Sequence, residues 1–216
     1  MYTHNQKSQS DECLICLSNL HKITSLAHLV SPIPLCNECL QKFKILDKTI
    51  TFHHYPLRVL YHYDDFFKSL LFQYKGLYDY ALKDAFLVLF QNELKEKYGT
   101  HIIVVAPSSK DDNEIRGFAP MESIASTFSS YVFTGLYKKE KYKQSDLSYE
   151  ERQMVYKKID IMDGEQLTGQ KVLIFDDVIT SSSTLLACLS HVERYHPQSI
   201  ELMILSSKKE LEDIVC

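Results

Sequence analysis

Residues 172–184 read Val172-Leu-Ile-Phe-Asp-Asp-Val-Ile-Thr-Ser-Ser-Ser-Thr184, an apolar run followed by two carboxylates and five consecutive hydroxyl side chains. The apolar run, which begins after Lys171, predicts a buried strand that ends at Asp176 and Asp177. The hydroxyl-rich turn then opens a predicted helix over residues 182–195. Ligands of open α/β sheets bind at such carboxyl ends of strands, so this turn is a candidate binding site.

This turn has the chemistry of a ribose 5-phosphate site. A helix N-terminus favours a phosphate, and side-chain hydroxyls add further donors around it. The carboxylates can accept hydrogen bonds from sugar hydroxyls. Two alternatives stay open: a serine merely caps the helix, or Asp176 is a nucleophile or Mg²⁺ ligand as in phosphatase-like folds, although their Asp-x-Asp spacing is absent. The hydroxyl residues are Thr180, Ser181, Ser182, Ser183 and Thr184.

Strands and helices alternate along the rest of the chain. Asp64 or Asp65 can cap a helix through Tyr74 that Gly76 ends, and a second helix is predicted over residues 79–97. Further predicted helices cover residues 120–129 and 182–195, and predicted strands cover residues 101–106, 131–134, 171–176 and 200–205. This alternation predicts an α/β fold with a mostly parallel, doubly wound sheet and flanking helices.

Composition narrows the class of protein. With 45% hydrophobic and 24% charged residues in 216, the chain can bury a globular core. A net charge of −4 argues against nucleic-acid binding by the molecule as a whole. The chain lacks an apolar run of the roughly 20 residues that a membrane span needs and has no signal-like N-terminus, so we expect a cytoplasmic protein.

Four cysteines are grouped as Cys13-x2-Cys16 and Cys36-x2-Cys39, with nineteen residues between the pairs. Cytosolic thiols stay reduced, so such pairs indicate metal ligands before disulfides. Four thiolates fill all the coordination positions of a tetrahedral ion, which predicts a structural zinc site. Such a site would stabilise a segment that is too small to form a hydrophobic core of its own. Buried reduced cysteines and a dithiol redox pair remain alternatives, and His21 or His28 could replace a ligand.

The segment FDDVITSSST resembles the phosphoribosyl pyrophosphate (PRPP) signature of type I phosphoribosyltransferases. The resemblance implies that Asp176 and Asp177 hold the ribose 2′ and 3′ hydroxyls, and that they would be the catalytic residues of an enzyme. Residues 180–184 would wrap the 5′-phosphate, and Mg²⁺ would bind with PRPP. Ser182 stands where that family usually has glycine, which limits how closely the backbone can approach the phosphate.

The whole chain from Cys13 onward is similar to the competence protein F family, in which a four-cysteine module precedes such a domain. Gln73-Tyr-Lys-Gly76, Arg116-Gly-Phe118 and a Gln-x-x-Leu-x-x-x-x-Arg element over residues 144–152 agree with it. Ala119-Pro120 departs from that family's usual Asn-Gln. We therefore expect three parts, which are a disordered tail (1–10), a zinc-binding module (11–55) and a phosphoribosyltransferase-like domain (56–216).

The loop after the strand at residues 101–106 is a second candidate for ligand contact. Pro107, Ser108 and Lys110 could reach the pyrophosphate end of PRPP, although a plain surface loop fits equally well. Arg116 could pair with a phosphate or a carboxylate, and a structural ion pair is the alternative.

Residues 138–158 form the one clearly basic stretch. Lysines interleaved with tyrosines could bind single-stranded DNA, because lysines contact phosphates and tyrosine rings stack on bases. A solvated face and an active-site flap are the alternatives. The candidate residues are Lys138, Lys139, Lys141, Tyr142, Lys143 and Arg152.

The competence resemblance implies a function in natural transformation. The chain would bind PRPP and act with a helicase-like ATPase on incoming single-stranded DNA, in the cytoplasm and peripherally at a membrane DNA-uptake site. The alternative is a catalytically active phosphoribosyltransferase of nucleobase salvage or of an unknown acceptor.

Overall fold

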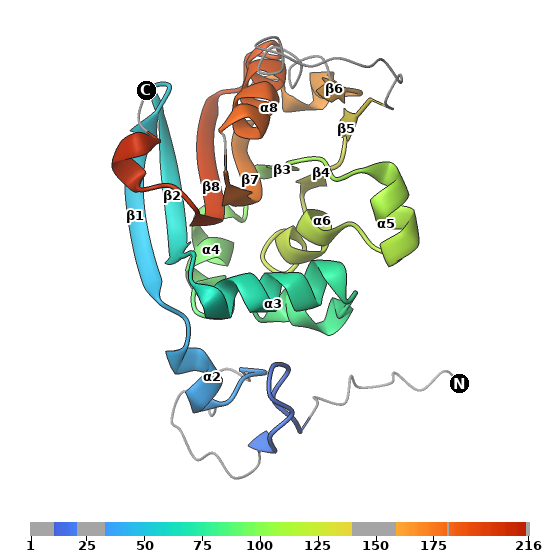
Figure 1. The fold of residues 1–216 in the computed structure, drawn as a ribbon. Helices are drawn as coiled ribbons and strands as arrows, with labels where there is room; N and C mark the ends of the chain where they lie inside the picture. Colours follow the sequence, from blue (N-terminus) through green and yellow to red (C-terminus); the bar gives the residue numbers. More distant parts are fainter. Residues whose placement is uncertain (1–10, 21–32, 140–158, 181, 215–216) are drawn as a thin grey trace, which may run out of the picture.

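The computed structural model describes residues 11–20, 33–139, 159–180 and 182–214. Its centre is a six-stranded sheet in the order β1-β2-β8-β7-β3-β4, parallel except where β1 meets β2 (Figure 1). The strands of this sheet are β1 (Ile45–Phe52), β2 (Tyr55–His62), β3 (Ile102–Val105), β4 (Val132–Phe133), β7 (Lys171–Ile179) and β8 (Ser199–Ser207). The mostly parallel sheet confirms the predicted fold class.

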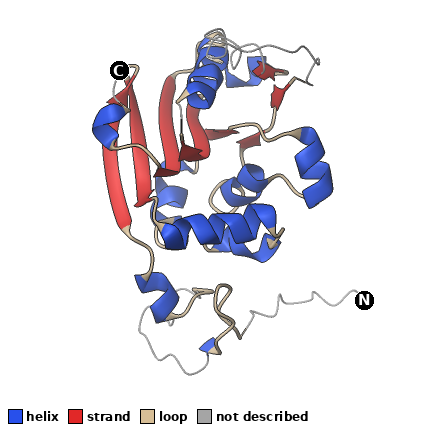
Figure 2. Cartoon of the chain, viewed as in Figure 1, coloured by secondary structure: helices blue, strands red, loops and turns tan. Residues whose placement is uncertain are grey.

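Helices flank this sheet on both faces (Figure 2). A second, two-stranded antiparallel sheet pairs β5 (Leu136–Lys138) with β6 (Ile159–Ile161). The helices are α2 (Asn37–Gln41), α3 (Asp65–Gly76), η2 (Tyr80–Asp84), α4 (Gln91–Tyr98), α5 (Lys110–Arg116), α6 (Pro120–Ala125), η3 (Gly164–Leu167), α8 (Ser183–Glu193) and η4 (Leu211–Asp213). No helix within these described ranges is long and apolar enough to cross a bilayer.

The alternation of side chains along β7 divides the core into two layers. Leu173 and Phe175 pack in a buried cluster with residues of α3, α4 and α6. Val172 and Ile174 pack in a second cluster with α8. Because successive strand residues point to opposite faces, β7 is buried on both sides, as a central parallel strand should be.

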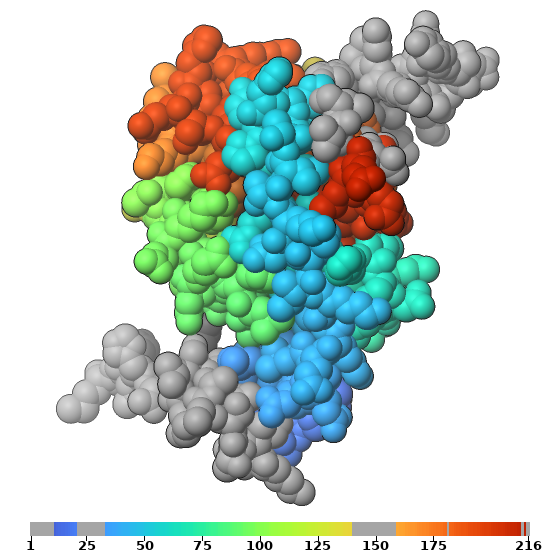
Figure 3. All heavy atoms as spheres, turned by 90° about the vertical axis from the view of Figure 1, so that its left-hand side faces the viewer, coloured from blue at the N-terminus to red at the C-terminus, as the bar shows by residue number. Residues whose placement is uncertain are grey.

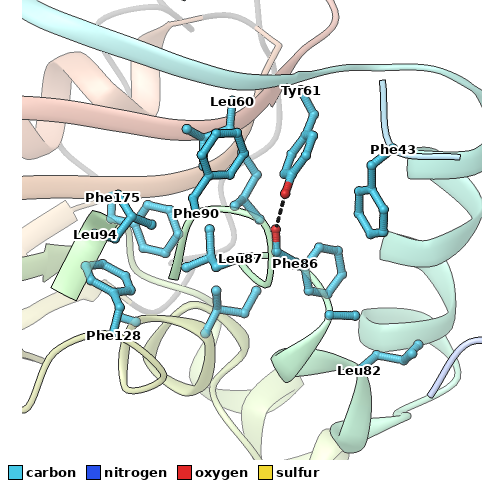
Figure 4. Close-up of a cluster of buried hydrophobic side chains, with 14 of the residues drawn as sticks. Phe43, Leu60, Tyr61, Leu82, Phe86, Leu87, Phe90, Leu94, Phe128 and Phe175 are labelled. Atoms are coloured by element: carbon cyan, nitrogen blue, oxygen red, sulfur yellow. Dashed lines mark hydrogen bonds between the residues drawn. The ribbon is translucent and has the colours of Figure 1, made fainter. Parts of the chain in front are cut away.

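The helix predicted over residues 79–97 is wrong as one continuous element. It is η2, then a turn through residues 85–90, then α4. Ala85, Phe86 and Leu87 are all at most 1% exposed, and no single helix face can bury three consecutive residues. The Tyr61 hydroxyl donates to the Phe86 carbonyl at 2.8 Å, which satisfies this group outside a helix (Figure 4).

The hairpin of β1 and β2 was not predicted. His53 and His54 both have positive φ (45° and 73°), the backbone of a two-residue type I′ turn. Figure 3 shows the hairpin at the surface, between α4 and the C-terminal η4. The hairpin spans residue 55, where the sequence analysis placed the end of the cysteine module, and β2 continues into the sheet beside β8.

The helix predicted from Asp64 or Asp65 is confirmed as α3. Asp64 is its N-cap, and the Asp64 carboxylate accepts a hydrogen bond from the Phe67 N–H at 2.9 Å. Figure 1 shows α3 lying across the carboxyl ends of the parallel strands β7 and β8. This position brings α3 to the edge of the sheet where a ligand is expected.

Candidate functional site

The two adjacent carboxylates lie near the carboxyl end of β7 and leave the strand on opposite sides. β7 runs three residues beyond Asp176, because its pairing with β8 continues to Ile179. Asp176 continues the face that packs on α8, and it lines a cavity of about 20 Å³ with Thr184 and Leu185 of that helix. Asp177 continues the opposite face and meets α3.

Lys75, in the last turn of α3, forms an ion pair with Asp177 Oδ2. The other oxygen of Asp177 accepts from the Val178 N–H at 2.8 Å, and Asp176 Oδ1 accepts from the Asp177 N–H at 2.8 Å. The side chains of Lys75 and Asp177 are 27% and 18% exposed. The pair is therefore sheltered but still open to a ligand.

The electrostatics of the two carboxyl groups differ. Burial raises the pKa of Asp176, and the negative charge of Asp177 raises it further, to about 8. Burial also acts to raise the pKa of Asp177, but the Lys75 ammonium and the hydrogen bonds to this carboxylate together outweigh it, and the pKa is lowered. At neutral pH the negative charge of the pair therefore resides on Asp177, beside α3.

The hydroxyl-rich turn lies between β7 and α8. Thr180 is exposed, Ser183 and Thr184 are in the first turn of α8, and Ser181 lies outside the described residues. Ser182 has φ +45°, in the left-handed region that favours glycine. A cavity of about 20 Å³ has room for a water-sized group, so a phosphate requires this turn to rearrange.

The loop after β3 leaves the sheet beside β7. Pro107 is buried, Ser108 is half-buried and Lys110 is exposed at the start of α5. Asp111 and Asp112 occupy the first turn of α5, where carboxylates favour the helix but repel an anionic ligand.

Arg116 ends α5 and joins it to α3. Its Nε donates to the Lys75 carbonyl at 2.9 Å, and Nη1 donates to Asn113 Oδ1 at 3.2 Å. These contacts fix the last turn of α3 in place, so Arg116 positions Lys75.

The basic stretch is only partly described. Lys138 is exposed on β5, and Lys139 is paired with Asp160 of β6 at 2.9 Å. The predictions for Lys141, Tyr142, Lys143 and Arg152 fall outside the described residues.

The four predicted metal ligands come together. The Sγ atoms of Cys13, Cys16, Cys36 and Cys39 all lie within 4.8 Å of one another, and three of the four residues are buried. Cys16 Sγ and Cys36 Sγ are 3.6 Å apart. Zn–S bonds of about 2.3 Å in a tetrahedral site place sulfurs roughly 3.8 Å apart, so this donor set fits zinc.

A groove of about 690 Å³ runs beside α3, and the sequence analysis did not predict it. Lys75 and Arg116 line one part of it, so the groove adjoins the ion pair at Asp177. The residue of the candidate site that sequence reasoning missed is Lys75. Its only signal was its place in the element Gln73-Tyr-Lys-Gly76, because its partner lies 102 positions away.

Residues 85–213 match the phosphoribosyl transferase domain family. The chain belongs to this family. The matched range holds both carboxylates, the hydroxyl-rich turn and the loop after β3, whereas the cysteine cluster, the hairpin and α3 precede the matched phosphoribosyl transferase domain. No curated protein sequence matches the chain.

Solved structures of hypoxanthine phosphoribosyltransferases are similar at low identity. The Staphylococcus aureus enzyme is 14% identical with a TM-score of 0.36, and the alignment covers 56% of this chain and 60% of that one. A Bacillus anthracis hypoxanthine-guanine enzyme is 19% identical (TM-score 0.34, coverage 56% and 69%). The Trypanosoma cruzi enzyme is 14% identical (TM-score 0.38, coverage 58% and 67%). The family assignment therefore rests on the match to the phosphoribosyl transferase domain.

Proposed function

We propose that the carboxyl end of β7 binds PRPP, and that the chain is a phosphoribosyltransferase-type protein that uses this site. The observation that carries the proposal is the arrangement at β7, within the family match: two sheltered carboxylates, one held ionised by Lys75, directly before a hydroxyl-rich turn that opens α8. Carboxylates accept hydrogen bonds from ribose hydroxyls, and the free N–H groups of a helix N-terminus bind a phosphate.

Each group has a proposed role in binding. Asp177 accepts a hydrogen bond from a ribose hydroxyl. Asp176 faces the turn that binds the 5′-phosphate, from the side of α8. The donors to this phosphate are Thr180, Ser181, Ser182, Ser183 and Thr184. Pro107, Ser108 and Lys110 border the pyrophosphate end, where Arg116 keeps Lys75 in place. Carboxylate oxygens are the ligands that Mg²⁺ prefers, so Asp176 or Asp177 could hold it with the oxygens of PRPP.

In an active enzyme these residues would assist displacement of pyrophosphate from the ribose. Bound Mg²⁺ would neutralise the charge of the leaving pyrophosphate. The ionised Asp177 would orient the ribose and stabilise the positive charge that develops on the sugar.

Calorimetric titration with PRPP and Mg²⁺ tests the proposal, followed by an assay for pyrophosphate release. Asp177→Asn should weaken PRPP binding, because the amide carries no charge. Asp160→Asn is the matched control, since Asp160 is also ion-paired but lies on β6. Equal PRPP affinity in the wild type and Asp177→Asn would overturn the proposed site.

We propose that the four-cysteine cluster binds a structural zinc ion. The support is the mutual approach of four sulfurs, with three of the residues buried. Metal analysis of the purified protein should give one zinc per chain, and Cys16→Ser should lower it. Cys188→Ser is the control, because Cys188 is buried in α8 away from the cluster. A metal-free wild-type protein would refute the site.

We propose that the protein uses this PRPP site in DNA uptake during natural transformation. Its support is the resemblance to competence protein F, including a four-cysteine cluster ahead of the domain. A helicase-like ATPase and single-stranded DNA would be the partners, and Lys138 is an exposed candidate contact. A deletion strain should lose transformation and keep normal nucleobase salvage, whereas the reverse result would favour a salvage enzyme.

A further inference from the structure

The groove beside α3 is formed largely by one face of that helix. Asp65, Lys68, Phe72 and Lys75 line it, and their spacing of three and four residues places them on a single face. The opposite face of α3 holds Phe67, Leu70 and Tyr74, which are buried in the core. The helix therefore presents to the groove a set of side chains that its own packing does not require.

Phe72 provides a flat apolar surface in this groove. Its side chain is 61% exposed, although it is large and aromatic. A Cβ at Gly76 would lie 2.8 Å from the Phe72 ring, so the absence of a side chain at residue 76 lets the ring lie against the backbone. An aromatic ring held on one side and open on the other is suited to stacking against a planar ligand.

Charge defines the second property of the groove. Lys68 and Arg116 contribute positive charge against Asp65, while the charge of Lys75 is balanced by Asp177. Lys208, at the carboxyl end of β8, lies 5.0 Å from the ring of Tyr63, which also lines the groove. The excess of positive charge favours a negatively charged ligand.

Lys75 joins the groove to the carboxylates. It lines the groove and is also the partner of Asp177, so a molecule in the groove lies next to the proposed ribose site. Residues 63–76 precede the matched range of residues 85–213. Most of the groove therefore comes from a segment that precedes the matched domain, and Arg116 comes from within it.

We propose that this groove binds the acceptor as a planar ring that carries a negatively charged group, such as a carboxylate. The ring stacks on Phe72, and Lys68 and Arg116 attract the anionic group. The identification of this molecule as an acceptor rests on the proposed function, whereas binding in the groove does not.

Two pairs of probes, each differing in one charge, test the inference. Orotate and uracil differ by a carboxylate, and nicotinate differs from nicotinamide by a carboxylate in place of a neutral amide. Binding of each to the full chain is measured by calorimetry or saturation-transfer NMR, with and without PRPP and Mg²⁺. We expect at least one acid to bind more tightly than its neutral partner, by up to about fivefold for one solvent-exposed charge contact.

Variants locate that binding. Phe72→Ala should weaken binding of the acid about five- to 150-fold, the range for losing one stacking contact. Gly76→Ala should also weaken it, because the added Cβ would displace the Phe72 ring. Lys68→Gln should reduce the preference for the acid, since Arg116 remains, and leave the affinity for the neutral probe unchanged. The matched controls are Tyr131→Ala, also 61% exposed, and Lys95→Gln, an exposed lysine on α4.

The outcomes separate the groove from the PRPP site. Acid binding that depends on Phe72 and Lys68, in a protein that does not bind PRPP, would support the groove and overturn the proposed function. PRPP binding with no preference for either acid would overturn the groove and leave the PRPP site standing. Acid binding that survives Phe72→Ala and Lys68→Gln would also overturn it.

Discussion

The ion pair between Lys75 and Asp177 should contribute measurably to folding stability. Lys75→Met removes the cation and leaves a sheltered carboxylate without its partner. Asp177→Asn removes the charge but keeps an oxygen that can accept from the Val178 N–H. Combined in a double-mutant cycle, the two changes isolate the interaction of the two side chains from their other contacts.

The magnitude follows from distance and exposure. Two unit charges about 4 Å apart attract by roughly 4 kcal/mol at an effective dielectric constant of about 20. Desolvation offsets much of this, and Lys75 and Asp177 retain 27% and 18% exposure. We expect a coupling free energy of about 1–2 kcal/mol at pH 7, between the values for exposed and fully buried pairs.

Urea unfolding of the wild type, both single variants and the double variant measures this coupling. The Lys44–Asp64 pair is the control, because Lys44 is 67% exposed and a surface pair should give about 0.5 kcal/mol or less. Lys75 lowers the pKa of Asp177 below its ordinary value of 3.8, so its contribution is full above about pH 4 and is lost as the pH falls through the folded pKa. A coupling at pH 7 no larger than that of the control would refute the argument.

Three further changes have defined outcomes. Ser182→Gly should stabilise the protein by about 0.5–1 kcal/mol, because residue 182 has positive φ, whereas Ser190→Gly inside α8 should cost about 0.5 kcal/mol. Tyr61→Phe should cost about 1–2 kcal/mol by leaving the buried Phe86 carbonyl without its donor. Asp176→Asn should stabilise the protein more at pH 9 than at pH 5.5, because burial and the charge of Asp177 raise the pKa of Asp176 and make its ionisation in the folded state unfavourable.

Midpoints of denaturant unfolding, measured for each variant and the wild type under the same conditions, test all three predictions. Equal destabilisation by the two serine-to-glycine changes would contradict the backbone argument at Ser182. A Tyr61→Phe protein as stable as the wild type would mean that water replaces the lost donor at Phe86. An effect of Asp176→Asn that does not change between pH 5.5 and 9 would show that the Asp176 carboxyl titrates normally.

Local patterns predicted the elements that depend on neighbours in sequence. The cap at Asp64 and the apolar run before Asp176 were sufficient to predict α3 and β7, and the spacing of the cysteines predicted their cluster. These features depend on periodic or local sequence signals, so residue propensities and hydrophobic patterns are enough to predict them.

Features that depend on distant partners were not predictable in this way. The helix expected over residues 79–97 is interrupted where Tyr61, 25 positions from Phe86, takes over a backbone carbonyl. The extension of β7 to Ile179 depends on its pairing with β8. Lys75 gains its place in the site only because α3 lies across the end of β7. Tertiary contacts thus override or complete the local preferences at the positions that form the site.

The cysteine cluster and α3 share one buried core. Phe43, shortly after the second cysteine pair, packs against Phe66 of α3 with ring centroids 5.1 Å apart. Cys13, Cys36 and Cys39 belong to the same buried cluster as Phe67. If an ion at the cysteines changes the packing of this shared core, thermodynamic reciprocity requires that it change ligand affinity along α3 by the same factor by which the ligand changes the affinity for the ion. The groove and the cysteine cluster would then form one linked binding system, although their ligands do not touch each other.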